Sequence, residues 1–248
     1  MEPESHIEIA NIRHIIVSGF YAFLAFLLVL FQPDFGSAIV IFLIWLGMVL
    51  VSGLSKKHLF VVFAVGVIAF CGLWFFGFKD YQRDRVKVFL HPLADIRGAG
   101  YNAYQSTIAV GSGQVLGKGI GYGTQSKLQF LPEYQTDFIF AAFAEEWGFV
   151  GVLLFLCLFA LVMLRVLSLS FHGSSNFETL FGAGIFILLF THFFINIGMN
   201  IGLLPVTGIT LPFMSYGGES FNYRIWWARN SDGNAKVQEN CYIGVCSG

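Results

Sequence analysis

The chain contains 248 residues, of which 56% are hydrophobic, only 12% are charged and 29 are Phe. Soluble domains carry about 25% charged residues, so this composition excludes an ordinary soluble domain and predicts a protein whose solvent is the lipid bilayer. The formal net charge of −1 gives no basic field of the kind that attracts nucleic acid, and we expect no nucleic-acid partner. The spacing of the four Cys matches neither a zinc site nor a disulfide framework.

Five apolar stretches are predicted to be membrane-spanning helices, because such a helix needs about 20 mostly apolar residues. They run from about 15 to 31, 37 to 53, 59 to 78, 138 to 167 and 179 to 201. Residues 203–218, which contain Pro and Gly, are expected to form an irregular or re-entrant segment. The predicted fold is therefore all-α and polytopic, with five or six spans and a long polar loop at 79–136.

Basic residues in the short loops predict the orientation, because such residues are enriched on the cytoplasmic side. Those that flank the five spans on one side are Arg13, His14, Lys56, Lys57, Arg165 and His172. Residues 32–34, 79–136 and 203–218 are then predicted to face outward. The outward 79–136 stretch holds seven Lys and Arg, which conflicts with a simple count of basic residues and favours an anionic ligand on that face.

The apolar character ends at Gly218, and residues 221–248 are typical of neither a membrane helix nor a soluble domain. Permitted codons for this stretch, read one nucleotide later, can encode an apolar helix start. One hypothesis is therefore that the tail is a frameshift product, and the alternative is a genuine cytoplasmic extension. We expect residues 1–220 to form the membrane domain and 221–248 to lie apart from it.

Four long segments, in this order, resemble the SEDS family, which includes RodA, FtsW and SpoVE. They are FQPDFGSA at 31–38, YQRDRVKVFLHPLADIRGAGYNAYQSTIAVGSGQVLGKGIGYGTQ at 81–125, LPEYQTDFIFAAFAEEWGFVG at 131–151 and NIGMNIGLLPVTGITLPFMSYGG at 196–218. The RodA branch is slightly preferred through AVGSG, GTQSKLQFLPE and NIGMN. The family has about ten spans, so the resemblance implies a fragment that lacks the first four.

The resemblance implies a peptidoglycan glycosyltransferase that polymerises lipid II into glycan strands for cell elongation or division. It also implies a multi-pass protein of the bacterial plasma membrane, with its active site on the extracytoplasmic face. The expected partners are lipid II, the undecaprenyl-diphosphate-linked glycan and a class B penicillin-binding protein. Two alternatives from other classes are a lipid II flippase and a non-catalytic scaffold of the cell-wall synthesis complex.

Asp137 is the candidate catalytic residue. Formation of a glycosidic bond needs a base near the attacking hydroxyl, and the family's proposed catalytic Asp matches Asp137 in the motif TDF. The alternative is a helix N-cap, since Thr136 or Asp137 could satisfy the free N–H groups at the start of the fourth predicted span.

Basic side chains in the long outward stretch are candidates to bind the departing lipid diphosphate. Arg suits phosphate through its forked donors, so Arg85 is the first candidate, followed by Arg83 and Lys87. Lipid head-group contact or simple solvation is the alternative for all three. Lys118, between two Gly, could contact the ligand or be an ordinary surface lysine.

The remaining substrate-binding candidates are Gln125, Glu133 and Thr136, which lie in the matching motifs. Glu133 could line the cavity, bind a divalent cation with Asp137, or only cap a turn. Two carboxylates are a thin basis for a metal site, so no metal ligand set is assigned and a requirement for Mg²⁺ or Mn²⁺ stays open.

Polar residues within the predicted spans are costly in lipid and indicate function or an internal partner. For Glu145 and Glu146, a polar lock between helices and a role in the cavity are equally favoured. Asn196 and Asn200 fall on one helical face, where hydrogen bonding between helices is preferred over substrate contact. Asp34 follows Pro33 and is expected to be a turn or cap residue.

Overall fold

The computed structural model describes residues 12–32, 34–52, 60–62, 64, 66, 72, 80–90, 99–128, 130, 131, 133–172 and 176–215. Every regular element in these ranges is a helix, which confirms the predicted all-α class. The helices are α1 (Ile12–Phe31), α2 (Phe35–Val51), α4 (Asp80–Leu90), α5 (Ala99–Ser112), α6 (Thr124–Lys127), α7 (Ile139–Phe171) and α8 (Asn176–Asn200). The predicted third span lies largely outside the described residues, and the tail at 221–248 lies wholly outside them.

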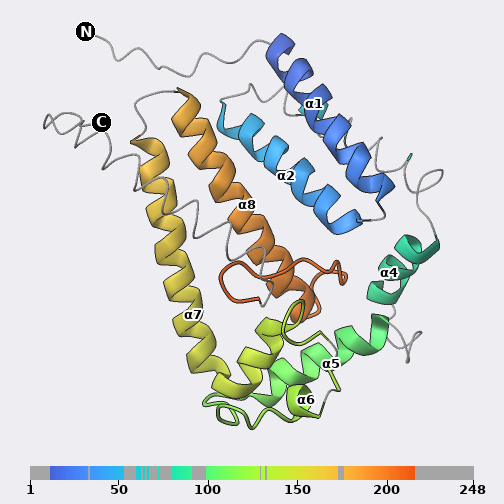
Figure 1. The fold of residues 1–248 in the computed structure, drawn as a ribbon, viewed down its shortest axis with the longest axis vertical. Helices are drawn as coiled ribbons and strands as arrows, with labels where there is room; N and C mark the ends of the chain where they lie inside the picture. Colours follow the sequence, from blue (N-terminus) through green and yellow to red (C-terminus); the bar gives the residue numbers. More distant parts are fainter. Residues whose placement is uncertain are drawn as a thin grey trace, which may run out of the picture.

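Four long helices form one side of the molecule, with α2 packed between α1 and α8, and α7 packed on α8 (Figure 1). Asp34 begins α2 as its N-cap, because its Oδ1 accepts a hydrogen bond from Ser37 N at 3.0 Å. The α7–α8 contact is aromatic, and the rings of Phe159 and Phe193 stack with centroids 3.9 Å apart. The apolar surface of each helix is thus buried only where it meets its neighbour.

Within the described residues, two helices are long and apolar enough to cross a membrane, α7 and α8. The apolar parts of α1 and α2, Ile16–Phe31 and Phe35–Val51, are shorter, near the lower limit of about 17 residues for a span. Large apolar side chains stay exposed along α7, including Leu153, Leu154, Leu158 and Leu161. Exposed Leu at this density indicates a helix that faces lipid.

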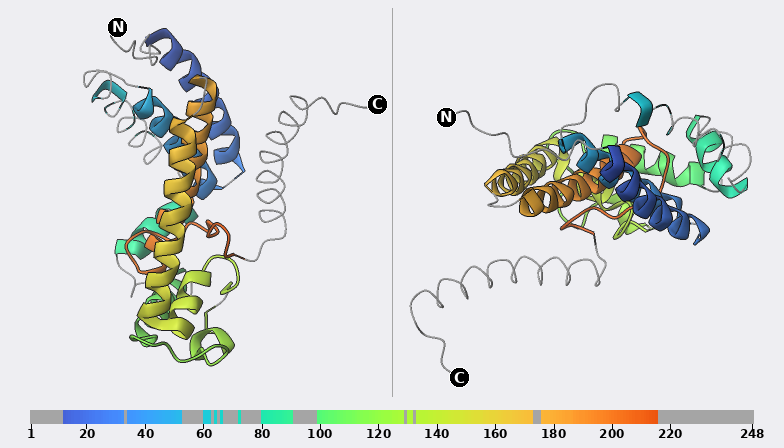
Figure 2. Two further views of the ribbon diagram at one scale, coloured as in Figure 1. Left: turned by 90° about the vertical axis from the view of Figure 1, so that its left-hand side faces the viewer. Right: turned by 90° about the horizontal axis from the view of Figure 1, so that it is seen from above.

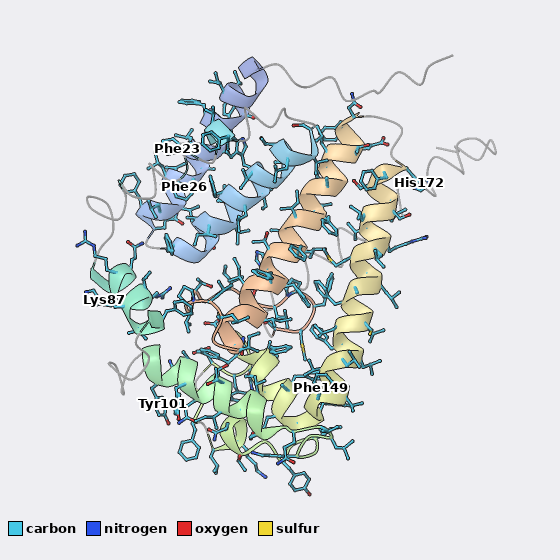
Figure 3. The ribbon with its side chains drawn as sticks, turned by 180° about the vertical axis from the view of Figure 1, so that it is seen from behind. Phe23, Phe26, Lys87, Tyr101, Phe149 and His172 are labelled. Carbon is cyan, nitrogen blue, oxygen red and sulfur yellow. The ribbon has the colours of Figure 1, made fainter. Side chains whose placement is uncertain are left out.

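The polar elements gather at one end of the α7–α8 pair (Figure 2). There α5 packs on α7 and α8, α4 contacts α5, and α6 contacts α7. Lys87 and Tyr101 lie toward this end, whereas His172 lies at the opposite end of α7 (Figure 3). The stretch predicted as a loop therefore contains packed helices, and residues 201–215 follow α8 there without regular structure.

A break in α7 lies at Gly148, whose φ of 65° and ψ of −167° are not helical. The loop at 113–119 supplies the backbone hydrogen bonds that the break removes. Lys118 N and Gly119 N donate to the carbonyls of Glu145 and Glu146, each at 3.0 Å. Beyond the break, the N–H groups of Phe149 and Val150 donate to Gln114 O and Val115 O at 2.9 and 3.1 Å. This loop therefore joins the short first part of α7 to the long apolar part.

Candidate active site

A tight turn at 133–138 places Asp137 just before α7. The N–H groups of Thr136 and Phe138 both donate to Glu133 O at 3.2 Å, and Glu133 adopts a positive φ of 54°. The Asp137 side chain is half-buried between this turn, α8 and the 201–215 segment. The turn sequence thus determines where the carboxylate enters the fold.

Asp137 does not cap α7. The N-cap is Phe138, which makes no side-chain cap hydrogen bond, and Ala141 N donates instead to Asn200 Oδ1 at 3.2 Å. A side chain of α8 therefore performs the capping that Asp or Thr at the N-cap would provide. Within the described part of the chain, no donor makes a hydrogen bond to the Asp137 carboxylate.

The surroundings of Asp137 disfavour its charged form. Burial raises the pKa of its carboxyl, the nearby Glu133 carboxylate raises the pKa further, and the Arg85 guanidinium opposes both effects. The net result is a pKa above the ordinary value. A raised pKa makes a carboxylate a stronger base once it is ionised.

A cavity of about 220 Å³ opens between α4, α5 and the start of the 201–215 segment. Among its described lining residues, Arg85 alone carries a charge, Tyr104 and Thr107 carry hydroxyls, and the others are apolar. Arg85 forms no salt bridge within the described part of the chain. The cavity therefore offers one available cation in an apolar surrounding, within electrostatic range of Asp137.

Asn196 and Asn200 bind the backbone around Asp137. Asn196 Nδ2 donates to Asp137 O at 3.0 Å and to Ile209 O at 2.7 Å, and Asn200 Nδ2 donates to Asp137 O at 3.1 Å. Both side chains are fully buried. Hydrogen bonding between helices was predicted for these two residues. In the structure they join α8 to the turn before α7 and also to the 201–215 segment.

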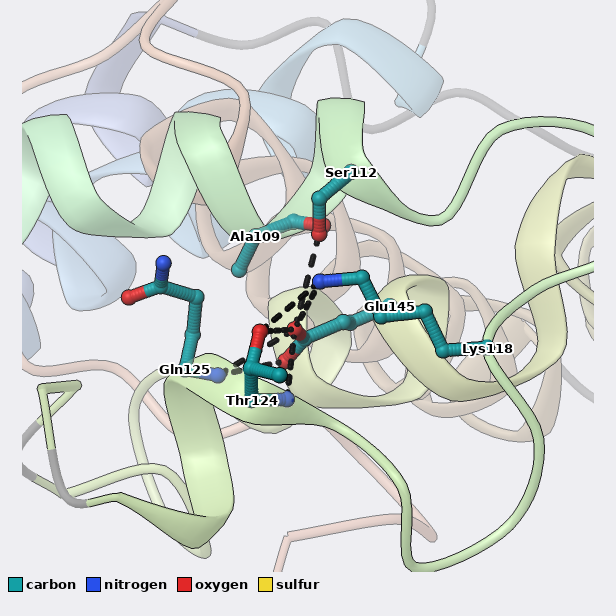
Figure 4. Close-up of polar contacts among 6 residues, drawn as sticks. All are labelled: Ala109, Ser112, Lys118, Thr124, Gln125 and Glu145. Carbon is teal, nitrogen blue, oxygen red and sulfur yellow. Dashed lines mark hydrogen bonds and ion pairs between the residues drawn. The ribbon is translucent and has the colours of Figure 1, made fainter.

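Glu145 lies in a second polar cluster, on the short first part of α7, and is fully buried (Figure 4). Its Oε1 accepts hydrogen bonds from Lys118 Nζ at 2.8 Å, Thr124 N at 2.8 Å and Thr124 Oγ1 at 2.9 Å. Gln125 N donates to both carboxylate oxygens at 3.1 and 3.2 Å. Of the two roles considered for Glu145, this geometry matches a polar lock, here between α7 and the loop that ends in α6.

The other predicted substrate-binding residues lie in several places. Lys87 is exposed and pairs with Asp84 at 3.1 Å. Arg83 lies on the same helix, α4. Glu133 is exposed, and its Oε2 accepts a hydrogen bond from Thr136 Oγ1 at 3.0 Å.

Lys118 and Gln125 both contact Glu145, and Glu146 contributes its carbonyl to the 113–119 loop. Substrate binding by all these residues stays a prediction. Sequence reasoning missed Ser106 and Ser215, which bind Asn200 and the Thr136 carbonyl, because a single Ser gives no signal of its distant partner.

Nothing in the described part of the chain brings together three or more His, Cys, Asp or Glu side chains that could hold a metal ion. Divalent cations such as Mg²⁺ are held by carboxylates together with substrate phosphates. At this site the available protein oxygens come from Asp137 and Glu133.

Comparison with known proteins agrees with this architecture. A family model described as cell cycle protein, covering FtsW, RodA and SpoVE, matches residues 3–226. The peptidoglycan glycosyltransferase MrdB of Escherichia coli K12 is 48% identical over 199 residues, which cover 80% of this chain and 54% of MrdB. Stage V sporulation protein E of Bacillus subtilis is 39% identical, with 80% and 53% covered.

A probable peptidoglycan glycosyltransferase FtsW of Neisseria gonorrhoeae is also 39% identical, with 84% of this chain and 45% of that protein covered. The higher identity to MrdB, a RodA protein, agrees with the predicted preference for the RodA branch. The chain spans about half the length of these curated relatives.

Solved structures with the same fold include a chain of a peptidoglycan synthase complex, described for its structural coordination of polymerization and crosslinking. It has a TM-score of 0.68 and 32% identity, with 86% of this chain and 58% of that chain covered. RodA of Thermus thermophilus has a TM-score of 0.55 and 28% identity, with 87% and 54% covered. Together with the four ordered sequence segments and the all-α bundle, these matches show that the chain belongs to the FtsW, RodA and SpoVE family of membrane proteins.

Proposed function

We propose that this protein acts as a peptidoglycan glycosyltransferase that polymerises lipid II, with Asp137 as the catalytic base. The observation that carries the proposal is a half-buried carboxylate that accepts no hydrogen bond from a described residue and has a raised pKa. This carboxylate stands within electrostatic range of Arg85, and Arg85 lines an apolar cavity. Relatives that are named peptidoglycan glycosyltransferases support the reaction class.

In the proposed reaction, Asp137 takes the proton from the attacking hydroxyl of the acceptor sugar. The hydroxyl oxygen forms a bond to the anomeric carbon of the lipid-linked donor chain while the bond from that carbon to the diphosphate oxygen breaks. The lipid diphosphate leaves with the bonding electron pair, and the configuration at the carbon inverts. Arg85 stabilises the charge that develops on the leaving group.

The apolar part of the cavity suits an isoprenyl chain, and Arg85 suits the diphosphate attached to it. Arg83, Lys87 and Lys118 remain candidates for phosphate contacts, and Gln125, Glu133 and Thr136 for sugar contacts. Asp137 or Glu133, together with the substrate phosphates, would hold a divalent cation, which would supply further charge neutralisation.

We further propose a multi-pass location in the bacterial plasma membrane, with the Asp137 end of the bundle on the extracytoplasmic side. The position of α4, α5, α6 and residues 201–215 at one end of α7 and α8 supports this sidedness. A class B penicillin-binding protein is the proposed partner. The similar peptidoglycan synthase complex, in which polymerization and crosslinking are coordinated, supports that choice.

The test is lipid II polymerisation in proteoliposomes that contain the protein and its penicillin-binding partner, with native protein compared with Asp137→Asn. We expect polymer from the native protein and a loss of about a hundredfold or more from the variant, the range for removal of a general base. Equal polymer from both would remove Asp137 as the base. No polymer from either, with an active partner, would favour the flippase or the scaffold.

A further inference from the structure

Two consecutive carbonyls, those of Thr136 and Asp137, each accept a hydrogen bond from a side chain outside the turn. Thr136 O accepts from Ser215 Oγ at 2.8 Å, and Asp137 O accepts from Asn196 Nδ2 at 3.0 Å. The two donors come from different parts of the fold, since Asn196 lies on α8 and Ser215 lies at the end of the 201–215 segment. The peptide that carries the Asp137 side chain is therefore held at two adjacent points.

The same two side chains also hold the irregular segment. The second N–H of the Asn196 amide donates to Ile209 O at 2.7 Å, and Ser215 Oγ accepts from Leu211 N at 2.8 Å. Asn196 thus bridges the Asp137 carbonyl to Ile209 of the segment, and Ser215 bridges the Thr136 carbonyl to Leu211. Attachment at two points restricts rotation as well as distance, so it fixes the orientation of the segment against the turn.

The segment held in this way passes in front of the Asp137 carboxylate. Gly208 adopts a positive φ of 77°, and a Cβ built on it would lie 3.6 Å from Asp137 Oδ2. Asn196 is fully buried, and Ser215 already uses its hydroxyl in two hydrogen bonds. These two side chains are thus suited to orient the carboxylate and residues 208–211 beside it, here called the 208–211 wall, and not to contact the substrate.

We propose that Asn196 and Ser215 are positioning residues, which together fix the Asp137 carboxylate against the 208–211 wall so that it can take the acceptor proton. The proposal rests on the proposed function of Asp137 as the base. The geometric requirement is strict, because a misplacement of about 1 Å can cost about a hundredfold in rate.

The charged groups that act on Asp137 are Glu133 from the turn and Arg85 from α4. From α8, the neutral amides of Asn196 and Asn200 contact its carbonyl, and His192 lies farther along with its Nδ1 3.3 Å from Thr210 O. A loosened turn would admit water to Asp137 and remove the burial that raises its pKa. Its pKa would then fall toward the ordinary value.

The test is lipid II polymerisation by Asn196→Ala and Ser215→Ala over a range of pH, in proteoliposomes with the penicillin-binding partner. Ser106→Ala is the matched control, because Ser106 donates to Asn200 O and Oδ1 within the same buried network but has no bond to Thr136, Asp137 or the segment. We expect kcat to fall about a hundredfold for Asn196→Ala and less for Ser215→Ala, with KM nearly unchanged. The acidic limb of the pH profile should move to lower pH in both variants and stay in place in Ser106→Ala.

An acidic limb at the native position in both variants, with activity reduced only in proportion to the folded protein, would overturn the proposal. If Asn196→Ala does not fold, the test rests on Ser215→Ala. A native kcat and a native acidic limb of the pH profile in Ser215→Ala would then overturn the proposal. Failure of the proposed function has a different signature, namely native activity in Asp137→Asn. The two failures are therefore distinguished in one set of assays.

Discussion

Asp137 and Glu145 are two carboxylates near the start of α7 that the fold treats in opposite ways. Glu145 is fully buried, and its oxygens accept hydrogen bonds from Lys118, Thr124 and Gln125. Asp137 is half-buried, and no described donor bonds to its carboxylate, although its carbonyl accepts two hydrogen bonds. A paired, buried carboxylate stabilises the fold, whereas an unpaired one keeps its lone pairs available for a proton.

The difference follows from where the surrounding hydrogen bonds end. Around Glu145 the donors reach the side chain, and around Asp137 they reach the backbone. Asn200 supplies the cap of α7, so Asp137 is not needed there. Because the backbone of Asp137 is anchored, its side chain can be fixed in position without being neutralised, which is the arrangement that a general base requires.

Glu145→Gln should destabilise the fold, because Glu145 is the carboxylate that is paired and buried. The substitution removes the charge that pairs with Lys118 and replaces one acceptor by a donor that faces other donors. We expect a loss of about 3 kcal/mol in the free energy of unfolding, the scale for breaking a buried pair. Thermal unfolding in detergent micelles measures it.

Glu146→Gln is the matched control, because Glu146 lies next to Glu145 and its carboxylate is outside this hydrogen-bond cluster. Glu146 is only partly buried, and we expect its effect to stay within about 0.5 kcal/mol, the range for substitutions away from buried networks. An equal loss in the two variants would show that Glu145 does not act as a specific lock.

Gly208→Asn tests whether the substrate reaches the Asp137 carboxylate past Gly208. Asn tolerates a left-handed backbone better than most residues, so the added side chain acts mainly by covering the carboxylate that lies 3.6 Å from the built Cβ. We expect lipid II polymerisation to fall about tenfold, which corresponds to about 1.4 kcal/mol. Gly121→Asn is the control, since Gly121 has a similar φ of 75° and no atom within 4 Å of a built Cβ. Equal activity in both variants would contradict an approach to Asp137 past Gly208.

Asp137→Asn should change the free energy of unfolding only slightly, and in the opposite direction to Glu145→Gln. Because the folded state has the higher pKa, it binds more protons than the unfolded state between the two pKa values. Stability conferred by this group therefore falls as pH rises through that window. Above the window, the ionised Asp137 destabilises the fold.

We therefore expect Asp137→Asn to be slightly more stable than the native protein at neutral pH. The difference should disappear below the ordinary carboxyl pKa, where both folded and unfolded states are protonated. Thermal unfolding at neutral and at acidic pH is the measurement. A variant less stable than the native protein at neutral pH would indicate that the Asp137 carboxylate has a stabilising partner.

Sequence patterns predicted some parts of the site and not others. The cap at Asp34 depends on local sequence and was predicted. The 133–138 turn and the approach of Arg85 to Asp137 were not predicted, because α4 and the start of α7 are far apart in the chain. The pairing of Lys118 with Glu145 was not predicted either, because both residues had separate local interpretations and their ion pair depends on how the 113–119 loop crosses the break at Gly148.

The apolar composition and the four ordered motifs were sufficient to predict the all-α membrane class, the main apolar helices and the family. Lipid requires long apolar stretches whose backbone bonds are made within each helix, and long ordered motifs identify a family without any structure. Three-dimensional packing determines which carboxylate accepts hydrogen bonds from the described residues, Glu145, and which does not, Asp137. The partners come from distant parts of the chain, as Asn200 caps Ala141 and Ser215 binds the Thr136 carbonyl, and no local pattern encodes which distant polar group reaches a buried one.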